Sequence, residues 1–249
     1  MSLTLSNSGG NGSLTLSNNG GLGGLTLIKS VSLVTNGLTL RLDAGNPASY
    51  DGSGSIWRDI SGTEQNIELV NSPTWPYIFA PDTLSYFTFN ALGSNQFGIG
   101  NGAVLSSTAY TKSVWFRLDG YDDNNLVSSD TGGHFMYMAG TSKLYNGHSN
   151  WGNYQAYPST ADIILNTWYN ATLTFNTTDG MVLYLNGLQD STYTAEKTAH
   201  GGDSSTNIAT FGGGNLLTGR IAKVYCYDRS LTSEEVLQNY NFDKSEFGL

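Results

Sequence analysis

Apolar and polar side chains alternate along much of the chain after residue 30. In residues 38–43, leucines at every second position alternate with Thr39, Arg41 and Asp43, which is the period of a strand with one buried face. Similar runs predict further strands at 86–89, 96–99, 110–118, 135–138, 168–175, 181–185, 207–211 and 220–227. The Asp179-Gly180 turn predicts that residues 172–175 and 182–185 form a hairpin. The pattern indicates an all-β meander.

A helix start signal lies near the C-terminus. Thr232 can cap the helix, and Glu235 three residues later completes a capping box. Leu231 can pack on Val236 as a hydrophobic staple. We expect about two turns of helix, ending at Gln238 or Tyr240.

The first 30 residues differ from the rest, because they are rich in Gly, Ser and Asn and contain SLTLSN twice, eleven residues apart. We interpret residues 1–30 as an extended arm preceding one domain, residues 31–249. Extended Leu-Thr-Leu segments can add to a sheet edge of a partner, so we favour an anchoring role over a merely repetitive linker. The leucines that alternate along the arm are the candidate anchors: Leu3, Leu5, Leu14, Leu16, Leu25 and Leu27.

Composition narrows the choice of fold and partner. The 249 residues include 31 glycines and only 12% charged residues, which suits short strands joined by tight turns. A net charge of -9 argues against nucleic acid as a partner. Cys226, the only cysteine, excludes an internal disulfide and is expected to be buried. We expect a soluble protein without membrane insertion, since we find no signal peptide pattern and no apolar run of roughly 18 residues.

Known catalytic motifs are not found in the sequence. There is no E-x-D-x-x-E string to supply the paired carboxylates of a glycosidase, and no nucleophile elbow or phosphate-binding loop. His134, His148 and His200 stand singly, so we expect them in loops or on the surface rather than at a zinc ion. We therefore expect no enzyme and no catalytic residues.

The order of several motifs carries a family resemblance. LTLRLDAGNPASY, SIWRDISG, the Trp168 to Phe175 strand, the Tyr-Leu-Asn-Gly turn at 184–187 and residues 219–236 follow one another as in LamG-like proteins. The chain resembles these members of the concanavalin A-like lectin/glucanase superfamily over residues 33–241, which implies a two-sheet antiparallel jelly-roll sandwich.

The sequence LDAGNPASY is similar to segments found in tailed-phage structural proteins. We therefore expect a non-enzymatic virion protein (a head decoration, fibre or tail component) that contacts other virion proteins through the arm and forms a homo-oligomer. The alternative is a carbohydrate-binding adhesin module that recognises surface glycans, with or without calcium.

The resemblance also implies calcium as the candidate cofactor, because LamG-like domains often bind it. A calcium ion needs six to eight oxygen ligands from a turn that wraps around it. The first candidate loop holds Asp59, Glu64 and Asn66, and the second holds Asp130. The alternative for Asp59, about equally supported, is that it caps its own turn by hydrogen bonding.

An aromatic segment supplies the candidate glycan site. Its sequence, GHSNWGNYQAY, shows no regular period and is expected to form a loop. Exposed aromatic rings can stack on sugars while polar groups donate hydrogen bonds. The candidates are Tyr145, His148, Trp151, Asn153 and Tyr154. We favour the alternative that these rings pack at a sandwich end or a subunit contact.

Overall fold

The computed structural model describes residues 14–17, 26–29, 31–76, 84–102, 104–129, 133–150, 153–202 and 204–249. Within the predicted arm, strands β1 (Leu14–Ser17) and β2 (Thr26–Lys29) pair with each other in antiparallel register, with Leu16 opposite Leu27. Leu3, Leu5 and Leu25 lie outside the described residues. The arm's role as an anchor stays a prediction.

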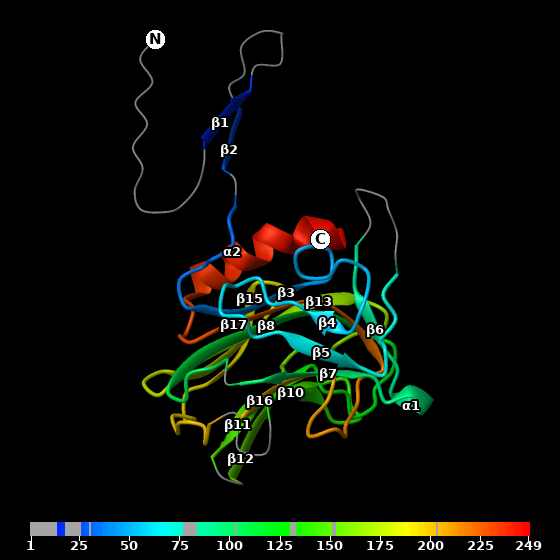
Figure 1. Cartoon of the computed structure of the whole chain (residues 1–249). Coiled ribbons are helices and arrows are strands. Elements are labelled where there is room, and N and C mark those ends of the chain that lie inside the picture. The colour runs from blue at the N-terminus through cyan, green and yellow to red at the C-terminus, as the bar shows by residue number, and fades with distance from the viewer. Residues whose placement is uncertain are drawn as a thin grey trace, which may run out of the picture.

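One layer of the domain is a seven-stranded antiparallel sheet (Figure 1). Its order is β15-β14-β13-β8-β17-β3, and β6 also pairs with β17. The predicted hairpin is confirmed, because Thr172 lies opposite Tyr184 and Thr174 opposite Val182. The strands are β3 (Leu38–Asp43), β6 (Phe87–Phe89), β8 (Ala109–Leu118), β13 (Trp168–Asn176), β14 (Gly180–Leu185), β15 (Leu188–Tyr193) and β17 (Gly219–Tyr227).

The facing layer consists of five strands in the order β4-β5-β7-β16-β9 and three in the order β10-β11-β12. Backbone bonds from Leu126 N to Met136 O (2.9 Å) and from Met138 N to Asn124 O (2.8 Å) join the two groups. The strands are β4 (Ile56–Trp57), β5 (Ile67–Val70), β7 (Phe97–Asn101), β9 (Val127–Ser128), β10 (His134–Met138), β11 (Leu144–Asn150), β12 (Asn153–Pro158) and β16 (Ser205–Ile208). A short helix, α1 (Ala91–Ser94), precedes β7.

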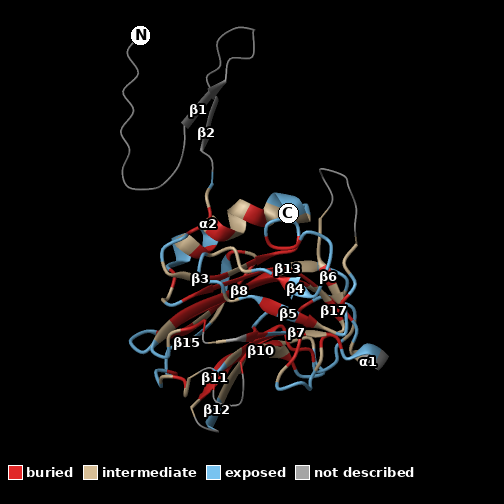
Figure 2. Cartoon of the chain, in the orientation of Figure 1, coloured by how far each residue is buried: buried red, intermediate tan, exposed pale blue. Residues whose placement is uncertain are grey.

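The main core lies between the two layers, where Figure 2 shows buried segments of both sheets facing each other. Leu40, Leu42, Val114 and Phe116 are buried there from the seven-stranded sheet. Cys226, the single cysteine of the chain, is buried, as predicted. The arrangement confirms the predicted all-β, two-sheet antiparallel sandwich.

The C-terminal helix covers the face of the seven-stranded sheet that points away from the other layer. Helix α2 (Ser233–Asp243) begins with the predicted Thr232–Glu235 capping box, and Leu231 and Val236 share one buried cluster. The helix runs beyond the predicted end and is followed by the 3-10 helix η1 (Lys244–Phe247). Contacts from distant sequence explain this length, because Asp243 pairs with Lys223 at 2.8 Å and accepts a bond from the Trp115 indole.

Candidate functional site

The segment predicted as an aromatic loop forms the β11–β12 hairpin, so that prediction was wrong. His148 lies opposite Gln155, and Ser149 lies opposite Tyr154. Polar residues and glycine hide the strand period, and the pairing requires glycine at position 147. A Cβ there would lie 1.7 Å from the carbonyl oxygen of Gln155. The close approach of β12 to β11 therefore depends on Gly147.

One face of the β10–β11–β12 sheet carries a row of aromatic rings. The Tyr137 and Tyr145 rings stack with centroids 5.5 Å apart. Phe135 lies 5.7 Å from Tyr137 and 6.0 Å from Tyr154, centroid to centroid. We call this face the outer face and these four residues the aromatic platform. Aromatic rings at these distances contact one another.

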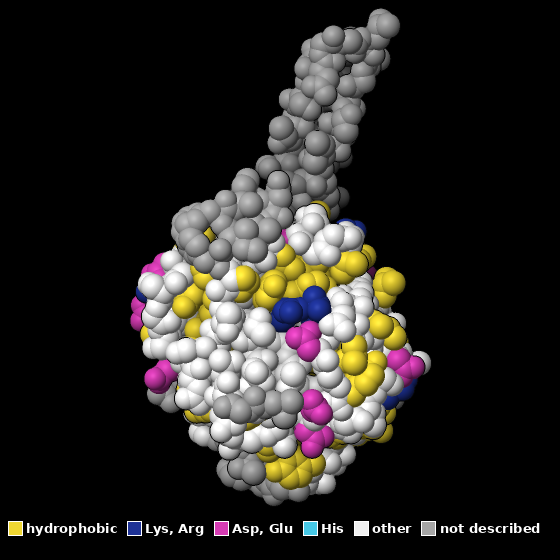
Figure 3. All heavy atoms as spheres, turned by 90° about the vertical axis from the view of Figure 1, so that its right-hand side faces the viewer, with side chains coloured by type: hydrophobic (Ala, Val, Ile, Leu, Met, Phe, Trp, Pro, Cys, Tyr) yellow, Lys and Arg dark blue, Asp and Glu magenta, His cyan; other side chains and the backbone are white. Residues whose placement is uncertain are grey.

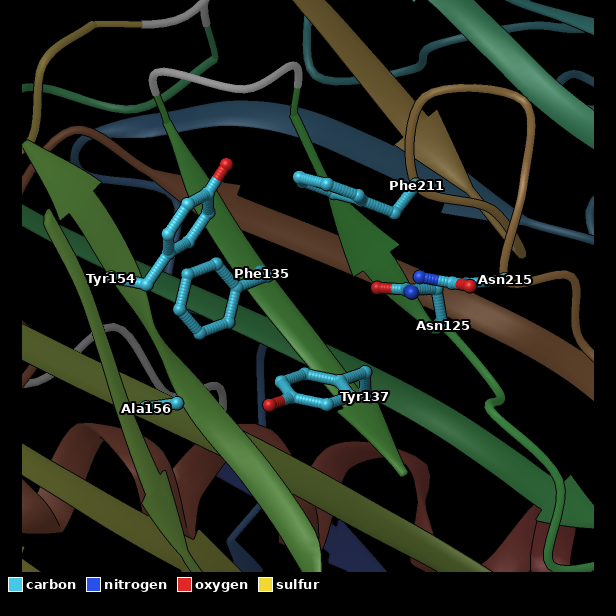
Figure 4. Close-up of a pocket in the computed structure, with 7 residues that line it drawn as sticks. All are labelled: Asn125, Phe135, Tyr137, Tyr154, Ala156, Phe211 and Asn215. Carbon is cyan, nitrogen blue, oxygen red and sulfur yellow. The ribbon is translucent and has the colours of Figure 1, made fainter. Parts of the chain in front are cut away.

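A pocket of about 220 Å³ opens on the platform (Figure 4). Phe135, Tyr137, Tyr154 and Ala156 line it from the sheet. The remaining lining residues are Asn125, Phe211 and Asn215. Figure 4 shows rings arranged around the pocket and the two asparagine side chains close to each other at one side. The pocket therefore combines an apolar wall with a polar one, as ligand sites commonly do.

Hydrogen bonds hold the polar side of the pocket, formed by Asn125 and Asn215, in place. Phe211 and Gly214 exchange two backbone hydrogen bonds of 3.0 Å, which close a tight loop. The carbonyl of Asn215, a residue with φ of 46°, accepts a bond of 3.2 Å from Asn125 N. Asn125 Oδ1 accepts a 2.6 Å bond from Ser128. Within the described residues, the Asn125 Nδ2 group and the Asn215 amide remain available to a ligand.

The opposite, inner face of the same sheet carries titratable groups. Tyr110 OH lies 3.1 Å from His148 Nδ1, and Lys112 Nζ lies 3.4 Å from His134 Nδ1. The Lys112 ammonium also donates to the Phe135 carbonyl. All four side chains are fully buried. These contacts tie the three-stranded sheet to β8 in the facing layer.

Two further residues complete this inner cluster. His200 Nε2 lies 3.1 Å from the Ser106 carbonyl oxygen, and Glu196 Oε1 lies 3.6 Å from His148 Nε2. His200 and Glu196 are both buried. The prediction of loop or surface positions was therefore wrong for His134 and His148, which are buried in β10 and β11. His200 does lie in a loop, but it is buried with them. The inner cluster consists of Tyr110, Lys112, His134, His148, Glu196 and His200.

Burial keeps the histidines of the inner cluster neutral. It lowers the pKa of His134 well below 6.5 and that of His148 to about 3, with the Lys112 charge and neighbouring histidines adding to the effect. Burial also lowers the pKa of His200. These uncharged imidazoles are buried beside the Lys112 ammonium, and none of them opens onto the platform.

The predicted glycan-binding residues divide between the two faces. Tyr145 and Tyr154 belong to the platform, and Asn153 is exposed at the start of β12. His148 lies on the inner face, so it is not part of the site. Trp151 lies outside the described residues. The sequence analysis missed Asn125, Phe135, Tyr137, Phe211 and Asn215. Only the alternation of Phe135 and Tyr137 in a predicted strand could have indicated two of them.

The first candidate calcium loop is organised around the Asp59 carboxylate. Its Oδ1 accepts bonds of 2.8 Å from the backbone N–H groups of Arg41 and Ser61. Its Oδ2 accepts from the hydroxyls of Ser61 and Thr63 and from Gln65 N, at 2.8–3.1 Å. Burial alone would raise the pKa of Asp59, but these hydrogen bonds lower it. This arrangement agrees with the turn-capping alternative.

The other predicted calcium ligands are Asn66 and Glu64 in the same loop, and Asp130. Asn66 Oδ1 accepts a 2.9 Å bond from Asp59 N, and Glu64 is exposed with φ of 61°. Asp130 lies outside the described residues. Among the residues that the structure describes, no group of three His, Cys, Asp or Glu side chains is placed to hold a metal ion. Calcium binding stays a prediction.

The described helices are all too short or too polar to cross a membrane.

Similar folds occur among solved structures. The binding domain of botulinum neurotoxin DC in complex with rat synaptotagmin II is 14% identical, with a TM-score of 0.63 over 83% of this chain and 52% of that chain. A structure of botulinum neurotoxin type C, concerned with its interaction with two ganglioside molecules, is 15% identical (TM-score 0.65; 83% and 51%). The binding domain of Paraclostridial Mosquitocidal Protein 1 is 17% identical (TM-score 0.66; 83% and 52%).

The present chain thus spans about half the length of these structures, and the likeness concerns the fold. No curated protein matches the sequence. The family model described as the concanavalin A-like lectin/glucanases superfamily matches residues 92–237, more than half of the 249 residues. Together with the two-sheet sandwich, this match shows that the chain belongs to the concanavalin A-like lectin/glucanases superfamily.

Proposed function

We propose that this protein is a carbohydrate-binding module and that the pocket on the aromatic platform holds the sugar. The observation that carries the proposal is the meeting of aromatic rings and two asparagine amides in one pocket. The apolar face of a sugar ring can stack on Phe135 and the tyrosines. The amides of Asn125 and Asn215 can bind its hydroxyl groups, since an amide both donates and accepts hydrogen bonds.

The size of the pocket indicates how much of a glycan it holds. Its volume of about 220 Å³ is below the roughly 300–1,000 Å³ of sites for drug-sized ligands. A single sugar ring therefore suits it better than a long segment of polysaccharide. Tyr145, the fourth platform residue, stacks on Tyr137 outside the pocket lining and can contact the next sugar.

The chemistry of the lining favours binding over hydrolysis. Most glycosidases flank the scissile bond with two carboxyl groups, about 5–5.5 Å apart in retaining enzymes. The described residues that line this pocket include no Asp or Glu. The fold neighbours give modest support at the level of fold, since they include binding domains and a toxin studied for its interaction with gangliosides.

A panel of immobilised glycans, probed with the full chain and with Tyr154→Ala, tests the proposal. Tyr154 is 48% exposed, so its truncation should leave the fold intact while removing one wall of the pocket. Tyr86→Ala is the matched control, because Tyr86 packs on Trp168 at the other sheet. We expect Tyr154→Ala to lose at least about tenfold in affinity and Tyr86→Ala to bind normally. No binding by the full chain, or equal binding by both variants, would contradict the proposal.

The virion role stays a separate prediction from the sequence, with residues 1–30 as the anchor. It is compatible with glycan binding, because the arm and the pocket belong to different parts of the chain. Co-sedimentation of the full chain and of a chain lacking residues 1–30 with native particles would test it. Loss of co-sedimentation by a folded truncated protein supports the anchor, and unchanged co-sedimentation rejects it.

A further inference from the structure

The pocket is uncharged throughout its described lining. Asparagine, phenylalanine, tyrosine and alanine make up the whole of that lining. A glycan that ends in a carboxylate or sulfate would therefore lose hydration on binding without gaining a cation. The pocket offers it only amide and phenol groups.

An acidic side chain lies close to the pocket. Asp123 is exposed two residues before Asn125, which lines the pocket and pairs with Tyr137. The Asp123 charge also raises the pKa of Tyr137, although burial is the larger cause. The chain as a whole carries a net charge of -9. Figure 3, which shows one face of the molecule, has acidic side chains spread among uncharged ones.

A cation does lie behind the pocket, but it faces away. The Lys112 ammonium is fully buried on the inner face, where it donates to the Phe135 carbonyl and contacts His134. The backbone of β10 separates it from the outer face, so it can give no hydrogen bond to a ligand on the platform. The groups that a ligand can reach are thus neutral, with an acidic group nearby.

We propose that the pocket selects uncharged glycans and discriminates against those whose terminal sugar bears a carboxylate or a sulfate. This inference rests on the proposed glycan-binding function and names its substrate class. Asp123, two residues before Asn125, strengthens the discrimination, because like charges repel through the solvent.

Matched pairs of immobilised oligosaccharides test the inference, each pair identical except for one terminal sialic acid or one sulfate. We expect the neutral member to bind at least about tenfold more tightly at low salt. The difference in affinity between the two members should decrease as salt screens the Asp123 charge. Asp123→Asn should also decrease this difference. Glu68→Gln is the matched control, since Glu68 is exposed on β5, four strands from β10 in the order β5-β7-β16-β9-β10.

The outcomes separate this inference from the proposed function. Equal or tighter binding of the charged members, with Tyr154→Ala still weakening binding, would overturn the selectivity and leave the glycan site standing. Binding of neither member would overturn the glycan site itself. A difference in affinity that Glu68→Gln decreases as much as Asp123→Asn does would reject the role of Asp123.

Discussion

The two faces of the β10–β11–β12 sheet have opposite chemistry although they are built from the same strands. The outer face presents uncharged aromatic rings around a pocket. The inner face buries His134 and His148. They lie against Lys112 of β8 and against Glu196 and His200, which follow β15 in the chain. Neighbours in sequence belong to different faces, since His134 points inward and Phe135 lines the pocket. The strands therefore couple the scaffold directly to the site.

This difference shows that titratable side chains need not mark the ligand site. Strongly shifted pKa values often point to functional residues. In this protein, the three histidines with lowered pKa values lie on the inner face, whereas the pocket is lined by uncharged groups. The comparison predicts that changes on the inner face alter stability, and that changes on the outer face alter binding.

Gly147→Ala should have the largest effect, because a side chain at position 147 would disturb both the pairing of β11 with β12 and the Phe135 ring of the platform. Its Cβ would lie 1.7 Å from Gln155 O and 3.1 Å from the Phe135 ring, so β12 must move. We expect a loss of more than about 3 kcal/mol in the free energy of unfolding, measured in urea, together with loss of glycan binding. Gly214→Ala is the control, since its nearest contact is 3.8 Å away. Wild-type stability of Gly147→Ala would contradict the account of the hairpin.

Acidification should lower the stability of the protein through the histidines of the inner cluster. Unfolded histidines take up protons near pH 6.5, whereas folded His148 does so only at about pH 3. Since the unfolded state binds more protons in this window, stability should fall as pH drops from about 6.5 towards 3, by on the order of a few kcal/mol. Urea unfolding at a series of pH values measures this slope.

The matched variant for that experiment is His148→Asn, which should show a shallower slope. The pKa of Asp243, raised by burial, contributes in the opposite direction in both proteins and cancels from the comparison. Identical slopes would show that His148 is not held neutral by the fold.

Lys112→Met should lower the free energy of unfolding by less than Gly147→Ala does. It tests the same inner cluster as the His148 variant. The change leaves the Phe135 carbonyl without its lysine donor, which costs roughly 1–3 kcal/mol in the free energy of unfolding. The Lys112 charge lowers the pKa of all three histidines, so its removal should also reduce the acid sensitivity of stability. An unchanged pH slope in Lys112→Met would contradict this coupling.

Asn215→Gly should have the smallest effect and leave stability nearly unchanged. Glycine tolerates the φ of 46° at this position while removing the amide from the pocket. We expect glycan affinity to fall about fivefold, corresponding to about 1 kcal/mol for one hydrogen bond, in titration calorimetry. Asn95→Gly, at an exposed residue with φ of 45°, is the control. A loss of affinity in Asn95→Gly as well would remove the case for the Asn215 amide.

The long strands and the helix cap could be predicted because their signals are local. The alternation in residues 168–175 and the Thr232–Glu235 box need only short stretches of sequence. The β11–β12 hairpin could not, because its glycine and polar residues show no period and its pairing depends on the close approach at Gly147. The length of α2 depends on Lys223 and Trp115, which are distant in sequence.

The pocket could be predicted only in part. Tyr154 stood out in the sequence as an aromatic residue in a polar setting. Its partners Asn125, Phe135 and Asn215 come from separate segments that only the fold brings together. The burial of His148 likewise depends on Tyr110 and Glu196, far away in sequence. Strand register, which decides the face of each side chain, was the missing information.

Mapping where a neutral oligosaccharide binds would test the proposed site, by following backbone and side-chain resonances of the full chain during a titration. We expect Tyr137, Tyr154 and Asn215 to shift together with a single affinity, while the loop around Asp59 stays unchanged. Shifts confined to the Asp59 loop, or the lack of any shift with every neutral sugar of the panel, would contradict the claim that the outer face of this sheet is a glycan site.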